Sequence, residues 1–217
     1  MTHDAMAVNA INRRERVRSY YRDAFRIHGT SPRGVDWNSE ASQTTRFRQL
    51  ARIIPVTEAP RVLDYGCGYG AFLPYLRDTY PNASYIGFDI VPEMLNAARA
   101  INMHDPLALF IDSTIGIADM AVDVAVLNGV FHVRQEEPVL SWEAYARDSL
   151  QQVWRMTSVG IAFNVLSAYS DTDRRRPHLY YGAPEDWLQW CVATFGRHVS
   201  LLHDYGLYEF TVLVGRH

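Results

Sequence analysis

Arg61-Val62-Leu63-Asp64-Tyr65-Gly66-Cys67-Gly68-Tyr69-Gly70 is the stretch that decides the fold of this chain of 217 residues. Its first part is apolar and predicts a buried strand, which ends in a turn with glycine at three alternate positions. Residues 71–80, which follow, predict a helix. Glycine lets the backbone adopt positive φ and approach a ligand closely, and a helix N-terminus presents free N–H groups. The stretch therefore predicts a strand–turn–helix unit that binds a ligand at its turn.

A second predicted strand, residues 85–88, ends in Asp89. A carboxylate at this place in a β-α-β unit can accept two ribose hydroxyls, which indicates a nucleoside-containing cofactor. Gly66-x-Gly68-x-x-Ala71 also satisfies the dinucleotide fingerprint. However, the carboxylate of Asp64 would repel a pyrophosphate at the turn and attract an ammonium group. S-adenosylmethionine carries an ammonium group, a sulfonium and a ribose but no phosphate, so it is the favoured cofactor.

The stretch from Val62 to Gly70, together with Asp89, resembles motif I and its following acidic residue in class I S-adenosylmethionine-dependent methyltransferases. The resemblance continues over most of the chain. It implies an α/β fold with a doubly wound, mostly parallel seven-stranded sheet, an antiparallel C-terminal strand and an N-terminal helical lid. It also implies two parts, an N-terminal helical extension over residues 1–55 and an S-adenosylmethionine-binding domain over residues 56–217.

Alternating patterns along the rest of the chain agree with a parallel sheet. The predicted helices are residues 9–28, 42–54, 71–80, 92–100, 142–156 and 185–195. The predicted strands are residues 61–63, 85–88, 107–111, 122–127, 159–166, 199–202 and 208–214. The last two strands are joined by only five residues, 203–207, which predicts an antiparallel edge.

Residues directly after each strand should form the site, because ligands of open α/β sheets bind at the carboxyl ends of the strands. The resemblance implies that Asp89 holds the ribose, Ile90 packs on adenine and Asp112 accepts from the adenine amino group. Asn128 and the turn at Gly66 would face the methionine part. The residues predicted to bind the cofactor are Asp64, Gly66, Cys67, Gly68, Gly70, Asp89, Ile90, Asp112, Ser113, Asn128, Tyr21 and Arg46.

Aromatic residues ahead of the first strand are candidates for a lid over the cofactor. Tyr20, Tyr21 and Trp37 would either close over the ligand or only pack the helices against the body. Arg46, expected near the start of the next helix, could pair with the methionine carboxylate through two hydrogen bonds.

Methyl transfer needs mainly an acceptor held in line with the methyl group, because the sulfonium is already activated. An oxygen or nitrogen acceptor can also need a base, and His132, just beyond the fourth strand, is the best-placed candidate. A structural hydrogen-bonding role for His132 is the alternative, and His178 and His203 are weaker candidates. The predicted catalytic residues are His132, Asn164, Tyr180 and Tyr181. The tyrosines could stack on a substrate or surround the sulfonium, or they could be ordinary edge-strand residues.

Composition restricts the partners. Twenty-one Lys and Arg against 24 Asp and Glu give a formal charge of -3, which gives no sign of nucleic-acid binding. The two cysteines indicate no disulfide framework, no apolar stretch reaches membrane-spanning length, and the first residues lack a signal-peptide core. There is no metal triad. These features predict a cytoplasmic monomer or homodimer with a small-molecule substrate.

The predicted function is S-adenosylmethionine-dependent methyl transfer to a small-molecule acceptor. One alternative is attack on the aminocarboxypropyl carbon, including closure to azetidine-2-carboxylate with release of methylthioadenosine. A second alternative is a non-catalytic module that binds the cofactor. Methyl transfer gives S-adenosylhomocysteine, whereas attack on the aminocarboxypropyl carbon gives methylthioadenosine, so product analysis separates the two reactions.

Overall fold

The computed structural model describes residues 3–115, 117–120 and 122–216. Seven of its strands form one continuous sheet in the order β3-β2-β1-β4-β5-β8-β7. The strands of this path are β1 (Arg61–Tyr65), β2 (Ser84–Phe88), β3 (Ala108–Ile111), β4 (Val122–Leu127), β5 (Thr157–Ser167), β7 (Val199–Leu202) and β8 (Glu209–Gly215). All seven predicted strands are confirmed, with ends that differ by at most two residues.

Strand β8 is antiparallel to both of its neighbours, β5 and β7. The other pairs along the path are parallel, which confirms the predicted sheet. An eighth strand, β6 (Tyr181–Gly182), pairs with the end of β5 off this path. The sequence did not predict β6, because a two-residue strand inside a polar loop leaves no alternating pattern.

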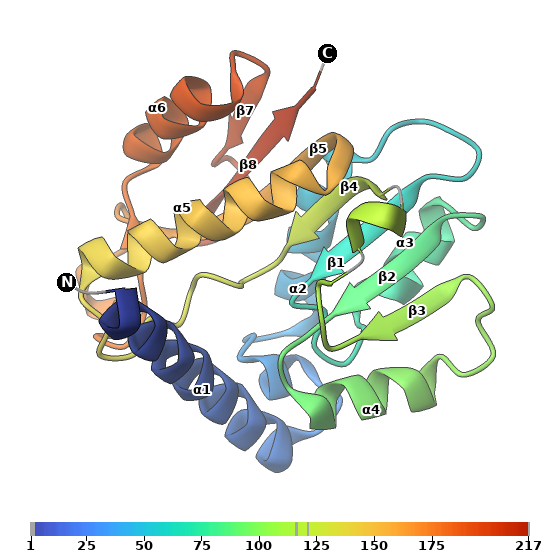
Figure 1. Ribbon diagram of the computed structural model, residues 1–217, viewed down its shortest axis with the longest axis horizontal. Helices are drawn as coiled ribbons and strands as arrows, with labels where there is room; N and C mark the ends of the chain where they lie inside the picture. Colours follow the sequence, from blue (N-terminus) through green and yellow to red (C-terminus); the bar gives the residue numbers. More distant parts are fainter. Residues whose placement is uncertain (1–2, 116, 121, 217) are drawn as a thin grey trace.

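Helices cover both faces of the sheet, as Figure 1 shows. After β1 come α3 (Phe72–Thr79), α4 (Pro92–Ile101), α5 (Val139–Arg155) and α6 (Pro184–Phe195), with short 3-10 turns η3 (Ile117–Met120) and η4 (Thr172–Arg174). Proline stands in the first turn of α4 and of α6, where its missing N–H costs nothing. Each predicted helix in this part is present.

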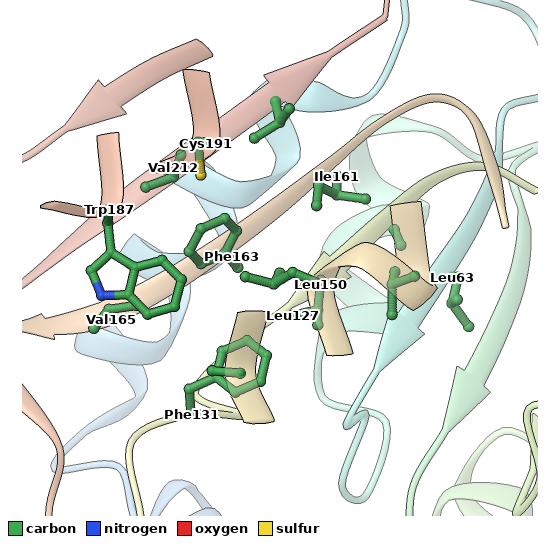
Figure 2. Packing of buried hydrophobic residues seen from close by; sticks show 14 of the residues in the cluster. Leu63, Leu127, Phe131, Leu150, Ile161, Phe163, Val165, Trp187, Cys191 and Val212 are labelled. Carbon is green, nitrogen blue, oxygen red and sulfur yellow. The ribbon is translucent and has the colours of Figure 1, made fainter. Parts of the chain in front are cut away.

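Successive residues of the central strands point to opposite faces and divide the core in two. On β1, Leu63 packs in a cluster with α5 and α6, whereas Val62 packs in a second cluster with α2 (Glu40–Leu50), α3 and α4. Figure 2 shows the first cluster, in which Phe163 of β5 lies between Trp187 and Leu150. Burial on both faces explains why the central strands read as continuous apolar runs.

Ahead of β1 lie α1 (His3–His28), η1 (Pro32–Val35), α2 and η2 (Ala51–Ile53). Helix α1 begins earlier than predicted, and the predicted helix over residues 42–54 is α2 followed by the tighter turn η2. Ser39 caps α2, because its hydroxyl accepts from the backbone N–H of Ser42. In Figure 1, α1 lies across the end of the sheet at which the parallel strands finish. This end is where the site residues were predicted.

Candidate functional site

The glycine turn after β1 is fastened to the end of β2. The backbone N–H groups of Gly66 and Cys67 donate to the carbonyl of Phe88 at 2.7 and 2.9 Å. Gly66 has φ +85° and Gly68 has φ +55°, and a Cβ at Gly68 would lie 2.9 Å from a methyl carbon of Val35. The turn therefore requires glycine for its conformation and for the close approach of the N-terminal segment.

Asp89 holds the same turn from the end of β2. Its Oδ2 accepts from the N–H of Gly68 at 2.7 Å, and its Oδ1 accepts from the N–H of Val91 at 2.8 Å. Burial raises the pKa of Asp89, although these backbone donors act in the opposite direction. A carboxylate offers about four lone-pair sites, so acceptor capacity remains for the hydroxyls of a ligand.

Asp64 is a second buried carboxyl, 2% exposed, near the end of β1. Its Oδ2 accepts from the hydroxyl of Tyr85 at 2.7 Å. Burial raises the pKa of Asp64 to about 7, against the effect of the Tyr85 hydrogen bond and with help from the nearby charge of Asp89. The carboxyl lacks a cationic partner among the described residues, so a ligand with an ammonium group would supply one.

A cavity lies between these carboxyls and the N-terminal helices. The free space inside it, its open mouth included, is about 890 Å³. Eight of the residues predicted to bind the cofactor line it: Asp64, Gly66, Cys67, Gly68, Asp89, Ile90, Asn128 and Tyr21.

A second groove continues from the cavity toward β3. Asp112 and Ser113, which do not line the cavity, line this groove. The cavity and the groove share four lining residues, Tyr65, Phe88, Ile90 and Tyr145. A ligand that extends from Asp89 past Ile90 can therefore reach Asp112.

Two of the predicted lid residues, Tyr21 and Trp37, line the cavity, and α1 is bonded to its rim. The hydroxyl of Tyr21 donates to the carbonyl of Gly129 at 3.4 Å, and Nε of Arg18 donates to the carbonyl of Ile90 at 2.8 Å. Tyr20 instead donates to Asp36 at 2.8 Å and lies outside the cavity lining. Of the three predicted aromatic residues, Tyr21 of α1 and Trp37, which follows η1, therefore lie at the cavity.

Arg46 and Gly70 lie elsewhere than predicted. Arg46 is in the middle of α2 and does not line the cavity; its Nε donates to Glu209 of β8 at 2.8 Å. Its guanidinium lies 3.9 Å from the ring centre of Trp37. Gly70 is also absent from the lining, because it faces β3, where a Cβ would lie 3.2 Å from the ring of Phe110.

Asn164 supports the site from behind. It is fully buried, and its Oδ1 accepts from the N–H of Gly129 at 2.7 Å. Its Nδ2 donates to Asn128 at 3.1 Å and to Glu209 at 3.0 Å. Asn164 does not line the cavity, so its contacts are those of a residue that positions the turn after β4.

His132 is 4% exposed and also lies outside the cavity lining. Burial lowers the pKa of His132 to about 3, and the positive charge of Arg46 acts in the same direction. The imidazole is therefore neutral at pH 7. A hydrogen bond joins the ring to the backbone of Asn164, whereas Nε2 has no hydrogen-bond partner among the described residues.

Tyr180 and Tyr181 do not line the cavity or the groove. Tyr180 is 1% exposed; its hydroxyl donates to Glu143 at 2.8 Å and accepts from Trp187 at 3.0 Å. Tyr181 lies in β6, and its hydroxyl accepts from the backbone N–H of Arg176 at 3.0 Å. Their predicted catalytic role finds no support in these contacts.

Gln43, Tyr69 and Tyr145 also line the cavity. Tyr69 belongs to the turn that was predicted to bind the ligand, whereas Gln43 and Tyr145 were not predicted. Gln43 is 5% exposed and is hydrogen-bonded to Tyr69. A signal existed for Gln43, because a polar residue stands on the buried face of α2, one turn before Phe47. Tyr145 of α5 gave no such signal, since an aromatic residue on an amphipathic helix is usually part of the core.

In the part of the chain that the structure describes, no group of three or more His, Cys, Asp or Glu side chains could hold a metal ion. No helix within the same residues is long and apolar enough to cross a membrane.

Known proteins resemble the chain in sequence. Residues 62–152 match the family model described as a methyltransferase domain. The provisionally named methyltransferase Rv1506c of Mycobacterium tuberculosis is 37% identical over 163 residues, which are 75% of this chain and 97% of that protein. Trans-aconitate 2-methyltransferase of Afipia carboxidovorans is 31% identical over 105 residues, 45% of this chain and 40% of the enzyme.

Solved structures resemble the fold. Magnesium protoporphyrin IX methyltransferase of Synechocystis PCC 6803, solved with bound S-adenosylmethionine, aligns with a TM-score of 0.60 at 14% identity, over 94% of this chain and 97% of its own. An S-adenosylmethionine-dependent methyltransferase of Aquifex aeolicus aligns with a TM-score of 0.58 at 21% identity, over 81% and 93%. At these identities the likeness concerns the fold alone.

Proposed function

Because this chain belongs to the family of class I S-adenosylmethionine-dependent methyltransferases, we propose that the cavity beside the glycine turn holds its cofactor and that its acceptor is a small molecule. The chain is a transferase that moves a methyl group from S-adenosylmethionine. The observation that carries the proposal is the cavity between Asp64, Gly68 and Asp89, which Tyr21 and Trp37 also line. The bound cofactor would supply a methyl group already activated by the sulfonium.

The roles of the cavity residues follow from their chemistry. Asp89 would accept the ribose hydroxyls through its remaining lone pairs, and Ile90 would pack on the adenine. Asp112 would accept from the adenine amino group at the groove that shares Ile90 with the cavity. Asp64 would face the ammonium group, because it is a buried carboxyl without a cation beside it.

The N-terminal part supports a covering role. Helix α1 and the segment around Trp37 would exclude water from the reacting atoms and hold the acceptor side of the cavity closed. A small acceptor agrees with this enclosure and with the net charge of -3. In this proposal residues 1–55 form the extension and residues 56–217 the cofactor-binding domain.

One experiment tests the reaction. The protein is incubated with S-adenosylmethionine and a library of small acceptors, and mass spectrometry follows the products. S-adenosylhomocysteine with a methylated acceptor supports the proposal. Methylthioadenosine, formed with or without an acceptor, would instead show attack on the aminocarboxypropyl carbon. Absence of both products with intact cofactor binding would favour the non-catalytic alternative.

Location and assembly belong to the same proposal. We expect a cytoplasmic monomer or homodimer, and the support is that Cys67 and Cys191 are both buried free thiols, as is usual in a reducing compartment. Light scattering after size-exclusion chromatography measures the assembly, and fractionation of the producing cell measures the location.

A further inference from the structure

Two buried nitrogens of residues that contact Trp37 have no hydrogen-bond partner among the described residues: Nη1 of Arg46 and Nε2 of His132. Their residues are 7% and 4% exposed. The other unpaired buried nitrogens belong to Arg13, Arg22 and Arg147, whose side chains are 13%, 33% and 34% exposed. A buried polar atom without a partner costs about 1–3 kcal/mol, so the pair at Arg46 and His132 calls for a ligand or a function.

Trp37 contacts both residues at the side of the cavity. The guanidinium carbon of Arg46 lies 3.9 Å from the Trp37 ring centre, and the His132 ring meets the same indole edge-on at 5.5 Å. The charge of Arg46 is close enough to affect the titration of His132. Trp37 lines the cavity, whereas Arg46 and His132 do not, so the indole forms the wall between them and the cavity.

The two nitrogens offer opposite hydrogen-bonding capacity. Nη1 of Arg46 can only donate. Nε2 of His132 can only accept, because the imidazole is neutral and its hydrogen bond to the Asn164 backbone leaves the other nitrogen bare. A hydroxyl matches both, since it donates to Nε2 and accepts from Nη1. A carboxylate would face the bare lone pair of Nε2, and an ammonium group would be repelled by Arg46.

We propose that Arg46 and His132 bind the acidic hydroxyl of the methyl acceptor, a phenol or an enol, and that Trp37 covers this subsite until the acceptor enters. This proposal rests on the proposed function, because it requires the methyl group in the adjoining cavity. It gives Arg46 a role on the acceptor in place of the predicted role on the methionine carboxylate.

The transfer step balances with these groups. The hydroxyl proton moves to Nε2 of His132, and the oxygen forms a bond to the methyl carbon while the carbon–sulfur bond breaks. The bonding electron pair stays on sulfur, which becomes the neutral thioether of S-adenosylhomocysteine, and the imidazolium later releases its proton to water. The Arg46 guanidinium stabilises the developing phenolate. A weakly basic imidazole accepts a proton more readily from an acidic hydroxyl than from an aliphatic alcohol, because the difference in pKa between donor and acceptor is smaller.

The test uses 4-nitrophenol as the probe and follows its binding to the complex with S-adenosylhomocysteine by absorbance. We expect the wild type to bind the probe saturably. The affinity should be at least about tenfold lower in His132→Leu and in the double variant Arg46→Gln/Glu209→Gln, in which the two residues form a neutral hydrogen-bonded pair. Trp37→Ala should bind the probe several-fold more tightly, because no indole has to be displaced. Trp190→Ala is the matched control, because it removes a tryptophan of α6 that also lies beside an arginine, Arg147 of α5. This variant should bind the probe as the wild type does.

Three outcomes overturn the proposal: no saturable binding of 4-nitrophenol, equal binding by the His132 and Arg46 variants, or tighter binding of 4-nitrobenzoate. A tenfold loss of S-adenosylhomocysteine affinity in the Arg46→Gln/Glu209→Gln protein would also overturn it and return Arg46 to the cofactor. Trp37→Ala is also titrated with the probe in the absence of S-adenosylhomocysteine, which tests the subsite independently of the cofactor. Failure of the wild type to bind S-adenosylhomocysteine would contradict the proposed function, whatever the result of that titration.

Discussion

The buried carboxyls of Asp64 and Asp89, at the same end of the sheet, differ in their hydrogen bonds. Asp89 accepts hydrogen bonds from the backbone N–H groups of Gly68 and Val91. Asp64 accepts a hydrogen bond from the hydroxyl of Tyr85. Burial raises the pKa of both, but fewer hydrogen bonds oppose this effect at Asp64, whose pKa is raised to about 7.

Cofactor affinity should consequently depend on pH through Asp64. Binding of an ammonium group favours the ionised carboxylate, so the affinity for S-adenosylhomocysteine should rise with pH up to about 7 and level off above. Below that pH it should fall, approaching tenfold for each unit. Calorimetry in buffers of different ionisation enthalpy would measure proton release on binding. Asp64→Asn should bind more weakly and lose this slope; the same slope in that variant would assign the proton to another group.

Asp89→Ala should weaken binding of S-adenosylhomocysteine by about 1.5–3 kcal/mol, the usual contribution of hydrogen bonds to a charged acceptor. Part of the loss would come through the turn, because Gly68 and Val91 lose their acceptor as well. Calorimetry measures the affinity, and circular dichroism checks the fold. Ser113→Ala, in the exposed groove, is a milder comparison. Wild-type affinity in a folded Asp89→Ala protein would remove Asp89 from the ribose role.

At the scale of elements, α1 is a cover held by polar contacts. Arg13 and Arg16 both pair with Glu137, and Arg18 bonds the carbonyl of Ile90. Burial opposes ionisation of Glu137, but the Ser141 hydroxyl and the two guanidinium groups hold its pKa below the ordinary 4.5. A lowered pKa stabilises the folded form above 4.5, and this contribution disappears as the pH falls through the lowered value.

Binding of S-adenosylhomocysteine should protect α1 from proteolysis. We expect slower cleavage within residues 11–39 when S-adenosylhomocysteine is added, because Tyr21 and Trp37 line its cavity. Deletion of residues 1–39 should leave a folded protein that binds the ligand poorly. Cleavage sites of the protected segment are read by mass spectrometry, with Glu137→Gln as a variant of weakened docking. Equal digestion rates with and without ligand would make α1 a packing element only.

The elements that could be predicted from the sequence are those defined by neighbours along the chain. The turn at Gly66 and Gly68 and the acid after β2 have a local spacing, and the apolar runs of the central strands are continuous. Gln43 and Trp37 carried signals of their own, a polar residue on a buried helix face and an aromatic residue in a loop, but the packing that brings α2 and the segment after η1 to the cavity has no local pattern. The same holds for Arg46, whose partner Glu209 is 163 residues away.

That distant pair acts at the scale of the whole molecule, since it ties α2 to β8. Side chains of Arg46 and Glu209 are 8% and 0% exposed. Glu209→Leu should destabilise the protein by about 3–5 kcal/mol, because it leaves the buried guanidinium without its partner. The double variant Arg46→Met/Glu209→Leu should recover most of this loss. Urea unfolding measures both, and a double variant as unstable as the single one would show that packing, not charge, decides.

The reversed strand β8 has a consequence for biosynthesis. It lies between β5 and β7, and β7 pairs with no other strand of the described chain. Because β7 is synthesised before β8, β7 has no pairing strand and the edge of β5 is unpaired until β8 is complete. Arg46 is synthesised much earlier than Glu209 of β8, so it also lacks its ion-pair partner until then. A nascent chain halted before residue 209 would expose an aggregation-prone strand and a lone buried cation, so elongation speed near this point should affect the yield of native protein.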